Sequence, residues 1–232
     1  MSIPPIRPYA LPTAAELLPP AVDWRPDPRR CAVLIHDMQR YFVDFLPRGA
    51  SPTTGLLETI GSLRTAGLPV IFSVQPGGMS RGERGLVHDF WGPGMSTDPA
   101  HRSVVAPLTP AAGDHVVTKY RYSAFFRTGL AQLMKDLGRD QLAVCGVFAH
   151  IGCLATAMDA FAHDIQPFLL ADATADFTRA DHLAALHHAA RRCAVTMTTG
   201  TFLSALGRAP AARPAPPARL SPASGRSAAG GS

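Results

Sequence analysis

The segment that most constrains the fold is QLAVCGV at residues 141–147, which leads into a turn and then an amphipathic stretch. The segment is short and apolar on both faces, as strands are when helices cover both sides of a parallel sheet. Leu154, Met158 and Phe161 recur at i, i+4 and i+7, which predicts a helix that opens near Gly152 and buries this stripe. Ligands bind beyond the carboxyl ends of parallel strands, where a helix N-terminus offers free N–H groups to anions. The turn is therefore the predicted site, and its ligand is predicted to be an anion.

Five further apolar segments alternate with stretches that have helical spacing. The predicted strands lie at residues 31–36, 69–74, 115–119, 166–171 and 193–199. The predicted helices lie at residues 53–66, 126–137 and 178–192, in addition to the one that opens near residue 152. Such alternation requires right-handed crossovers between parallel strands. We therefore expect an α/β fold with three α/β/α layers around a doubly wound, mainly parallel, Rossmann-like sheet of about six strands.

The two ends of the chain differ in composition from its middle. Residues 1–28 are rich in proline, so we expect an irregular arm that lies over the domain or over a partner subunit. Residues 29–206 form the predicted α/β domain, and within them residues 76–100 contain enough Gly and Pro to predict a long, irregular, functional loop. Residues 207–232 are a Pro/Ala/Gly-rich tail that has too few apolar residues to fold, and we expect it to be disordered.

Charge and hydropathy exclude several classes of protein. The net charge is +5, but four arginines in residues 207–232 leave about +1 for the remainder, which therefore lacks the basic stripe of a nucleic-acid-binding protein. No apolar run approaches the ~20 residues that span a bilayer, and the N-terminus has no apolar signal segment. The four cysteines have neither disulfide nor metal-ligand spacing and are expected to be reduced thiols. These features predict a soluble cytoplasmic protein.

Three polar features follow three different predicted strands. Asp37 directly follows the first strand, Lys119 ends the third, and the turn at residues 149–153 follows the fourth. Taken singly, each side chain is equally well explained by structure alone, Asp37 as a helix N-cap and Lys119 as a solvated strand end. Because the carboxyl ends of parallel strands meet at one edge of the sheet, the three features together predict a site.

Several longer motifs carry a resemblance to a known family. They are LIHDMQRYF, the QPG after the second strand, DFWGPGM, TKYRYSAFF, GVFAHIGCLATAMDAF and QPFLLADATADF. Over residues 5–206 they resemble the isochorismatase family of the cysteine-hydrolase-like superfamily. The resemblance is greatest to vinyl-ether hydrolases that act on isochorismate in siderophore pathways or on 2-amino-2-deoxyisochorismate in phenazine pathways, and RGL, DFWGPGM and SAFF favour the second group. It also implies a homodimer.

The resemblance assigns catalytic roles to individual residues. Asp37 matches the family's catalytic aspartate and Lys119 its catalytic lysine. The nucleophilic cysteine of the superfamily falls on Gly152, a glycine that isochorismatases share, and we expect this residue to leave space for the substrate ring and to offer an N–H to a carboxylate. Cys153 lies one residue later, and this shift turns a helical side chain by about 100°. Cys153 is therefore expected to belong to the core.

The resemblance also predicts a substrate pocket. Its lining residues match Phe42, Gln75, Arg84, Trp91 and Phe148. The guanidinium of Arg84 is expected either to pair with a substrate carboxylate or to lie solvated in its loop. Phe148 stands where close relatives have tyrosine, and Tyr120 where they have tryptophan. The first difference removes a hydroxyl beside the site, so these residues do not indicate which substrate ring is preferred.

We predict neither a metal ion nor a cofactor. The Asp-x-His spacing of the superfamily's metal sites is missing after the second strand, and a zinc site needs three or four converging ligands. His36 and His150, the histidines nearest the predicted site, are expected to be polar neighbours rather than ligands.

The predicted reaction is hydrolysis of the enolpyruvyl ether of a small anionic substrate, with Asp37 as the general acid that protonates the methylene carbon. Two alternatives remain at this point. Cys153 could be the nucleophile of an amidase, or the chain could be a non-catalytic docking subunit of a biosynthetic complex. The presence of both Asp37 and Lys119 argues against the second alternative.

Overall fold

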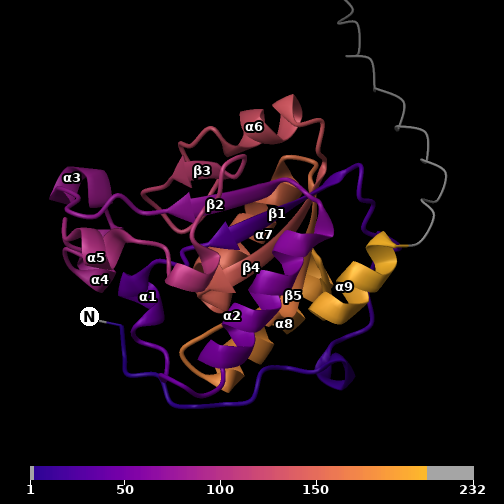
Figure 1. Cartoon of the computed structure of the whole chain (residues 1–232), viewed down its shortest axis with the longest axis horizontal. Coiled ribbons are helices and arrows are strands. Elements are labelled where there is room, and N and C mark those ends of the chain that lie inside the picture. Colours follow the sequence, from indigo (N-terminus) through magenta and orange to yellow (C-terminus); the bar gives the residue numbers. More distant parts are fainter. Residues whose placement is uncertain (1–2, 208–232) are drawn as a thin grey trace, which may run out of the picture.

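Six parallel strands form the central sheet of the computed structural model, in the order β3-β2-β1-β4-β5-β6 (Figure 1). The structure describes residues 3–207. The strands are β1 (Cys31–His36), β2 (Val70–Val74), β3 (His115–Thr118), β4 (Gln141–Val147), β5 (Gln166–Ala175) and β6 (Val195–Met197). Every pairing between these strands is parallel, which confirms the doubly wound α/β fold.

Helices cover both faces of the sheet because its strands are apolar on both sides (Figure 1). In β1, Val33 and Ile35 pack on the side of α2 (Thr53–Leu63) and α9 (Thr199–Leu206). Ala32 and Leu34 of the same strand pack on the opposite side. The helices there are α6 (Leu130–Asp136), α7 (Leu154–Ala162) and α8 (Arg179–Arg192). The result is the expected three-layer arrangement.

The sheet reverses its winding direction between β1 and β4. The chain proceeds from β1 to β2 and β3 on one side, and from β4 to β5 and β6 on the other. The segments that leave β1 and β4 therefore diverge, and this opens a crevice at the carboxyl ends of the strands. Asp37 leaves β1 at this point, and a π-helical turn, Ala149–Cys153, follows β4 before α7 begins.

The prediction that α7 buries the apolar stripe of Leu154, Met158 and Phe161 was wrong. Met158 and Phe161 are 46% and 49% exposed, whereas Thr156, Ala157 and Ala160 are buried. Small side chains face the sheet because they allow the helix to pack closely on it, and the large side chains point outward. Phe161 instead contacts Trp24 of the N-terminal arm, with ring centroids 6.4 Å apart.

Two further elements differ in length from their predictions. The predicted helix over residues 126–137 begins only at Leu130, and Phe126 lies outside it, 44% exposed. Strand β5 continues beyond the predicted residue 171 to Ala175, where Thr174 and Ala175 pair with Gly146 and Val147 of β4. Polar groups within this extension have partners. Asp172 accepts hydrogen bonds from Thr199, and the Thr174 hydroxyl donates to the Leu170 carbonyl. β6 is correspondingly shorter than the predicted 193–199.

The prediction that residues 76–100 are irregular was also wrong. The segment contains α3 (Arg81–Arg84), α4 (Val87–Trp91) and the start of α5 (Pro99–Arg102). Ser80 and Glu83 form a capping box at the start of α3, and Asp98 caps α5, whose first residue is proline. These local signals allow short helices between the glycines and prolines.

The remaining described residues form connecting segments. α1 (Arg40–Val43) follows β1, and 3-10 turns lie at Ala14–Glu16, Arg64–Ala66 and Ala106–Leu108. The N-terminal arm is fastened to the domain by the Tyr9 hydroxyl, which accepts from the Asp176 N–H at 2.7 Å. No helix within residues 3–207 is long and apolar enough to cross a membrane. The tail predicted to be disordered lies outside the described residues apart from Gly207.

Candidate active site

A cavity of about 610 Å³ lies at the carboxyl edge of the sheet, where residues that follow β1, β2, β3 and β4 come together. All eight residues singled out from the sequence line it: Asp37, Phe42, Gln75, Arg84, Trp91, Lys119, Phe148 and Gly152. The topology of the sheet thus brings together side chains that are up to 115 positions apart in the chain.

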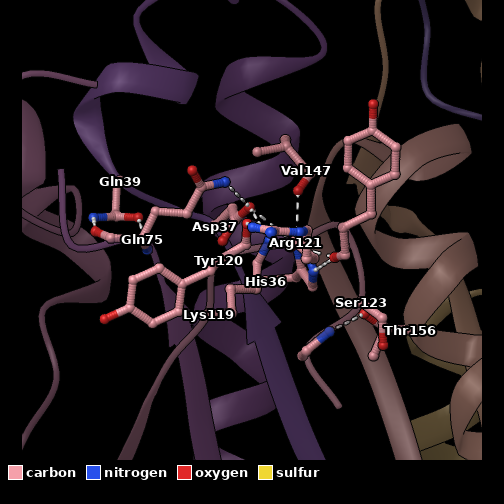
Figure 2. A network of polar contacts seen from close by, with 12 residues as sticks. His36, Asp37, Gln39, Gln75, Lys119, Tyr120, Arg121, Ser123, Val147 and Thr156 are labelled. Carbon is pink, nitrogen blue, oxygen red and sulfur yellow. Dashed lines mark hydrogen bonds and ion pairs between the residues drawn. The ribbon is translucent and has the colours of Figure 1, made fainter. Parts of the chain in front are cut away.

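Asp37 and Lys119 form a buried ion pair in this cavity, with 2.8 Å between Oδ2 and Nζ (Figure 2). Their side chains are 7% and 1% exposed. Asp37 has a φ of +51°, a left-handed conformation that aspartate tolerates better than most residues. Its N–H donates to the Ser73 carbonyl, and the Lys119 N–H donates to the Val74 carbonyl. Strand β2, which contains Ser73 and Val74, therefore fixes both backbones.

The hydrogen bonds of this pair leave one carboxylate oxygen free. Lys119 Nζ also donates to the carbonyls of Arg121 at 3.0 Å and Tyr122 at 3.3 Å, which uses all three of its donors. Asp37 Oδ2 accepts a second hydrogen bond from Gln75 at 3.3 Å. Asp37 Oδ1 is buried and has no partner among the described residues. An unsatisfied buried oxygen of this kind calls for an explanation, and a ligand or a proton would supply one.

Gln75 is held in place by Gln39, the residue that precedes α1. The Gln75 N–H donates to Gln39 Oε1 at 2.7 Å, and Gln39 Nε2 donates to the Gln75 carbonyl at 2.9 Å (Figure 2). Gln39 Nε2 also donates to the carbonyl of Arg102, the last residue of α5, at 2.8 Å. This amide pair links the loop after β1 to the loop after β2 and so orients the Gln75 side chain toward Asp37.

Arg84, the last residue of α3, is 5% exposed. Its Nε donates to the Gly92 carbonyl, and within residues 3–207 no carboxylate lies within ion-pair distance of it. Burial lowers the pKa of this guanidinium from its ordinary value. The backbone of Gly94 lies directly against the guanidinium, because an added Cβ there would come within 2.4 Å of Arg84 Cζ. A buried cation without a protein anion marks a site for an anionic group.

Aromatic side chains form one wall of the cavity. Phe148 packs edge-on against Phe42 and Phe177, with centroid distances of 6.3 Å and 4.6 Å. Trp91 contacts Phe177 at 5.8 Å, and its Nε1 donates to the Tyr122 hydroxyl at 2.7 Å. A wall of rings beside a cationic group suits a ligand that is both cyclic and anionic.

The structure corrects the expectation that Gly152 leaves space for the substrate ring. Gly152 lines the cavity, but a Cβ added to it would lie 2.2 Å from Cε1 of His36. The imidazole of His36, which is fully buried, already fills the space beside the glycine. A glycine is therefore needed at position 152 because the His36 ring leaves no room for a side chain there.

The two histidines near the site have protein partners. His36 lies between the carbonyls of Val147 and Tyr122. His150 binds Asp176 through Nδ1 at 2.5 Å; burial lowers the pKa of His150, but this hydrogen bond and the charge of Asp176 outweigh it and raise the pKa overall. Within residues 3–207 no group of three or more His, Cys, Asp or Glu side chains could hold a metal ion.

Cys153 does not line the cavity and is fully buried in the core on the side of α6, α7 and α8. Burial raises the pKa of its thiol well above the ordinary value, and the nearby Cys145, Asp37 and Asp176 raise it further. A nucleophilic cysteine needs the opposite environment, in which the thiolate is exposed and stabilised.

The sequence did not single out several other lining residues. They are Ile3, Tyr41, Val87, Arg121, Tyr122, Val147, Ile151 and Phe177. Tyr120, considered only as a departure from the family, also lines the cavity. Arg121 follows Lys119 by two positions, so its place near a strand end was a usable signal. Ile3 and Phe177 reach the cavity through tertiary packing, for which the sequence contains no local signal.

Comparisons with known proteins agree with this architecture. Residues 31–201 match the isochorismatase domain model. The chain is 47% identical to an isochorismatase of Bacillus subtilis, over 91% of this chain and 69% of the relative. It is 49% identical to phenazine biosynthesis protein PhzD1 of Pseudomonas aeruginosa, over 87% of this chain and 98% of the relative. It is 44% identical to enterobactin synthase component B of Escherichia coli, over 88% and 73%.

Solved structures show the same fold. A cysteine hydrolase from Pseudomonas syringae superposes with a TM-score of 0.71 at 22% identity, over 81% of this chain and 97% of that one. An isochorismatase family protein from Desulfovibrio vulgaris superposes with a TM-score of 0.65 at 27% identity, over 78% and 100%. Together with the domain match and the three relatives, these similarities establish that the chain belongs to the isochorismatase family.

Proposed function

We propose that this protein is a vinyl-ether hydrolase that cleaves isochorismate or 2-amino-2-deoxyisochorismate, releasing pyruvate and, respectively, a dihydro-dihydroxybenzoate or a dihydro-aminohydroxybenzoate. The names of its relatives support this proposal, since they include an isochorismatase and proteins of phenazine and enterobactin biosynthesis. The observation that carries it concerns residues 3–207: a carboxylate whose buried oxygen has no partner there shares a cavity with a buried arginine that has no acidic partner there. The pathway served is then one of siderophore or phenazine formation.

The reaction needs a proton on carbon and no nucleophilic side chain. The terminal methylene carbon of the enolpyruvyl group accepts a proton, which leaves an oxocarbenium ion centred on the ether carbon. Water adds to that carbon and loses a proton. The hemiketal then collapses. The bond from this carbon to the ether oxygen breaks, and this oxygen, which stays attached to the ring, takes up a proton while pyruvate forms.

Asp37 is the proposed general acid. Its Oδ1 has no partner among residues 3–207, whereas Oδ2 is held by Lys119 and Gln75. A proton on Oδ1 therefore faces no competing acceptor among the described residues. After the transfer, the Asp37 carboxylate is placed to stabilise the oxocarbenium ion that it produced.

Lys119 opposes this role, because a general acid must be protonated and an ammonium 2.8 Å away favours the ionised form of Asp37. A substrate with two carboxylates resolves this conflict. Negative charge beside Lys119 and Arg84 offsets the positive charge of the cavity, and closure of the site around the ligand excludes water. Both effects favour a protonated Asp37 once the substrate is bound.

Incubating the purified protein with each of the two substrates, with pyruvate formation followed by a coupled assay, tests the proposed function. Rapid pyruvate release from one of them is the expected result. If neither substrate releases pyruvate, the alternative that the chain is a non-catalytic docking subunit gains support. The ratio of kcat/KM for the two substrates measures whether a hydroxyl or an amine is preferred on the ring.

Arg84→Met is expected to raise KM roughly 10- to 100-fold, because it removes hydrogen bonds to a charged group in a buried site. Arg84→Lys should recover only part of this loss, since an ammonium lacks the planar fork of the guanidinium. Arg48→Met is the matched control, because the Arg48 side chain is 82% exposed and outside the cavity. An unchanged KM in Arg84→Met would exclude Arg84 from substrate binding.

Cys153→Ala is expected to leave kcat and KM close to their wild-type values, because the buried thiol plays no part in the proposed chemistry. Iodoacetamide should label the native protein slowly, since all four thiols are buried, and should label it fully in urea. Rapid labelling that abolishes activity in the wild type, together with loss of activity in Cys153→Ala, would instead favour the amidase.

We also propose a cytoplasmic homodimer, as the family resemblance implies. Met158 and Phe161 project from α7 with nearly half of each side chain exposed, and a second copy of the chain would cover them. Equilibrium sedimentation measures the oligomeric state, and a mass of one chain at micromolar concentration would contradict the dimer.

A further inference from the structure

His36 is a buried polar side chain beside the site to which no catalytic or binding role has been given. It is the last residue of β1, directly precedes Asp37, and is fully buried. Its Nδ1 lies 2.9 Å from the Val147 carbonyl oxygen and its Nε2 lies 3.2 Å from the Tyr122 carbonyl oxygen. Nδ1 is also 3.7 Å from Asp37 Oδ2. The ring therefore lies between three segments that build the site (Figure 2).

The distances from the two ring nitrogens to their neighbours favour one tautomer of His36. Burial lowers the pKa of His36 to about 4, so the ring is neutral at pH 7 and has one N–H. The Val147 oxygen is the nearer acceptor, and the Tyr122 oxygen already accepts from Lys119 Nζ. We therefore assign the N–H to Nδ1, donating to Val147. On the other side, Nε2 packs against the segment that carries Lys119.

The same ring sets the residue type at position 152. An ideal Cβ on Gly152 would lie 2.2 Å from Cε1, 2.9 Å from Nε2 and 3.0 Å from Nδ1 of His36. A buried side chain held between two carbonyls has no free rotamer into which it could withdraw. Any residue other than glycine at 152 must therefore displace the imidazole, and with it the contacts to Val147 and Tyr122.

We propose that His36 is a positioning residue that acts as a spacer between the turn after β4 and the segment 119–122. By filling the space beside Gly152, it excludes every side chain from position 152 and fixes the separation of Asp37 and Lys119. The kinetic consequence of this proposal rests on the proposed function, whereas its consequence for packing does not.

The packing consequence is tested by a thermodynamic cycle on thermal unfolding. Gly152→Ala alone should lower Tm by roughly 2–12 °C, because it overpacks a buried site. His36→Ala removes the ring, so the variant with both changes should melt no lower than His36→Ala alone. Gly61→Ala is the matched control, since an added Cβ on this helical glycine meets nothing within 4 Å. An undiminished Tm for Gly152→Ala, or additive losses in the double variant, would overturn the proposal.

The kinetic consequence is tested with two substitutions that separate volume from hydrogen bonding. His36→Leu keeps bulk but loses the donor, whereas His36→Asn keeps an N–H three bonds from Cα, as Nδ1 is. We expect His36→Leu to lower kcat about tenfold or more with little change in KM, as small misplacements of reacting groups do, and His36→Asn to restore part of kcat. A lower Tm with unchanged kcat in both variants would reduce His36 to a purely structural role.

His182→Asn controls for the general cost of replacing a buried histidine. His182 is fully buried, its pKa is lowered to about 4 by burial, and it does not line the cavity. It should lose Tm while keeping kcat. If the wild type releases no pyruvate from either substrate, the proposed function fails, and the Tm cycle still decides whether His36 and Gly152 are coupled.

Discussion

Asp37→Asn is expected to lower kcat by roughly 10²- to 10⁴-fold, the range typical of a lost general acid. The substitution removes the transferable proton but preserves the size of the side chain. Asparagine also tolerates the left-handed backbone that Asp37 adopts at a φ of +51°, so the loop after β1 should keep its course. Stopped assays of pyruvate measure kcat, and calorimetric titration of the inactive variant measures substrate affinity.

The expected signature of Asp37→Asn is a loss of turnover with substrate binding retained. Asp44→Asn is the matched control, because Asp44 lies close in the sequence but outside the cavity, with its side chain 41% exposed. It should behave as the wild type. Turnover of Asp37→Asn within a few-fold of the wild type would remove Asp37 from the acid role and leave the identity of the proton donor open.

Lys119→Met is expected to lower the free energy of unfolding by about 3–5 kcal/mol, because it leaves the Asp37 carboxylate buried without its cation. The pair is deeply enclosed, with the Lys119 side chain 1% and the Asp37 side chain 7% exposed, so solvent screens it little. The carbonyls of Arg121 and Tyr122 also lose a donor. Urea denaturation at pH 7 measures the effect.

The double variant Asp37→Asn, Lys119→Met separates the lost pair from lost packing. It removes both charges, so its free energy of unfolding should be higher than that of Lys119→Met alone. If the two sites were independent, adding Asp37→Asn would instead lower the free energy of unfolding further. A double variant that is less stable than Lys119→Met would show that the two side chains are not energetically coupled. The 2.8 Å contact would then carry no weight in the account of the site.

The sequence predicted the features that depend on period and strand position. The strands were recognisable because β1 and β4 are apolar on both faces, and a parallel sheet requires this. Asp37 and Lys119 could be placed together because each follows a strand that ends at the same edge of that sheet. Gly152 could be placed at the cavity, although the structure shows that its lack of a side chain accommodates His36 rather than a substrate ring.

The features that the sequence did not predict depend on distances between remote residues. Met158 and Phe161 have helical spacing, yet α7 buries its alanines, because the depth of packing against the sheet decides which face is covered. The contact between His36 and Gly152 joins positions 116 residues apart, and no local pattern marks it. The short helices α3 and α5 depend on individual caps among glycines and prolines, which outweighed the composition of the segment.

The central claim is that the enzyme protonates the methylene carbon and that water attacks the ether carbon rather than the ring. A single experiment in D₂O containing ¹⁸O-labelled water follows both atoms by mass spectrometry, with pyruvate incubated alone as the control for exchange. The account predicts one deuterium in the methyl group of pyruvate and a ring product that retains its original oxygen. A methyl group without deuterium, or ¹⁸O on the ring product, would contradict it.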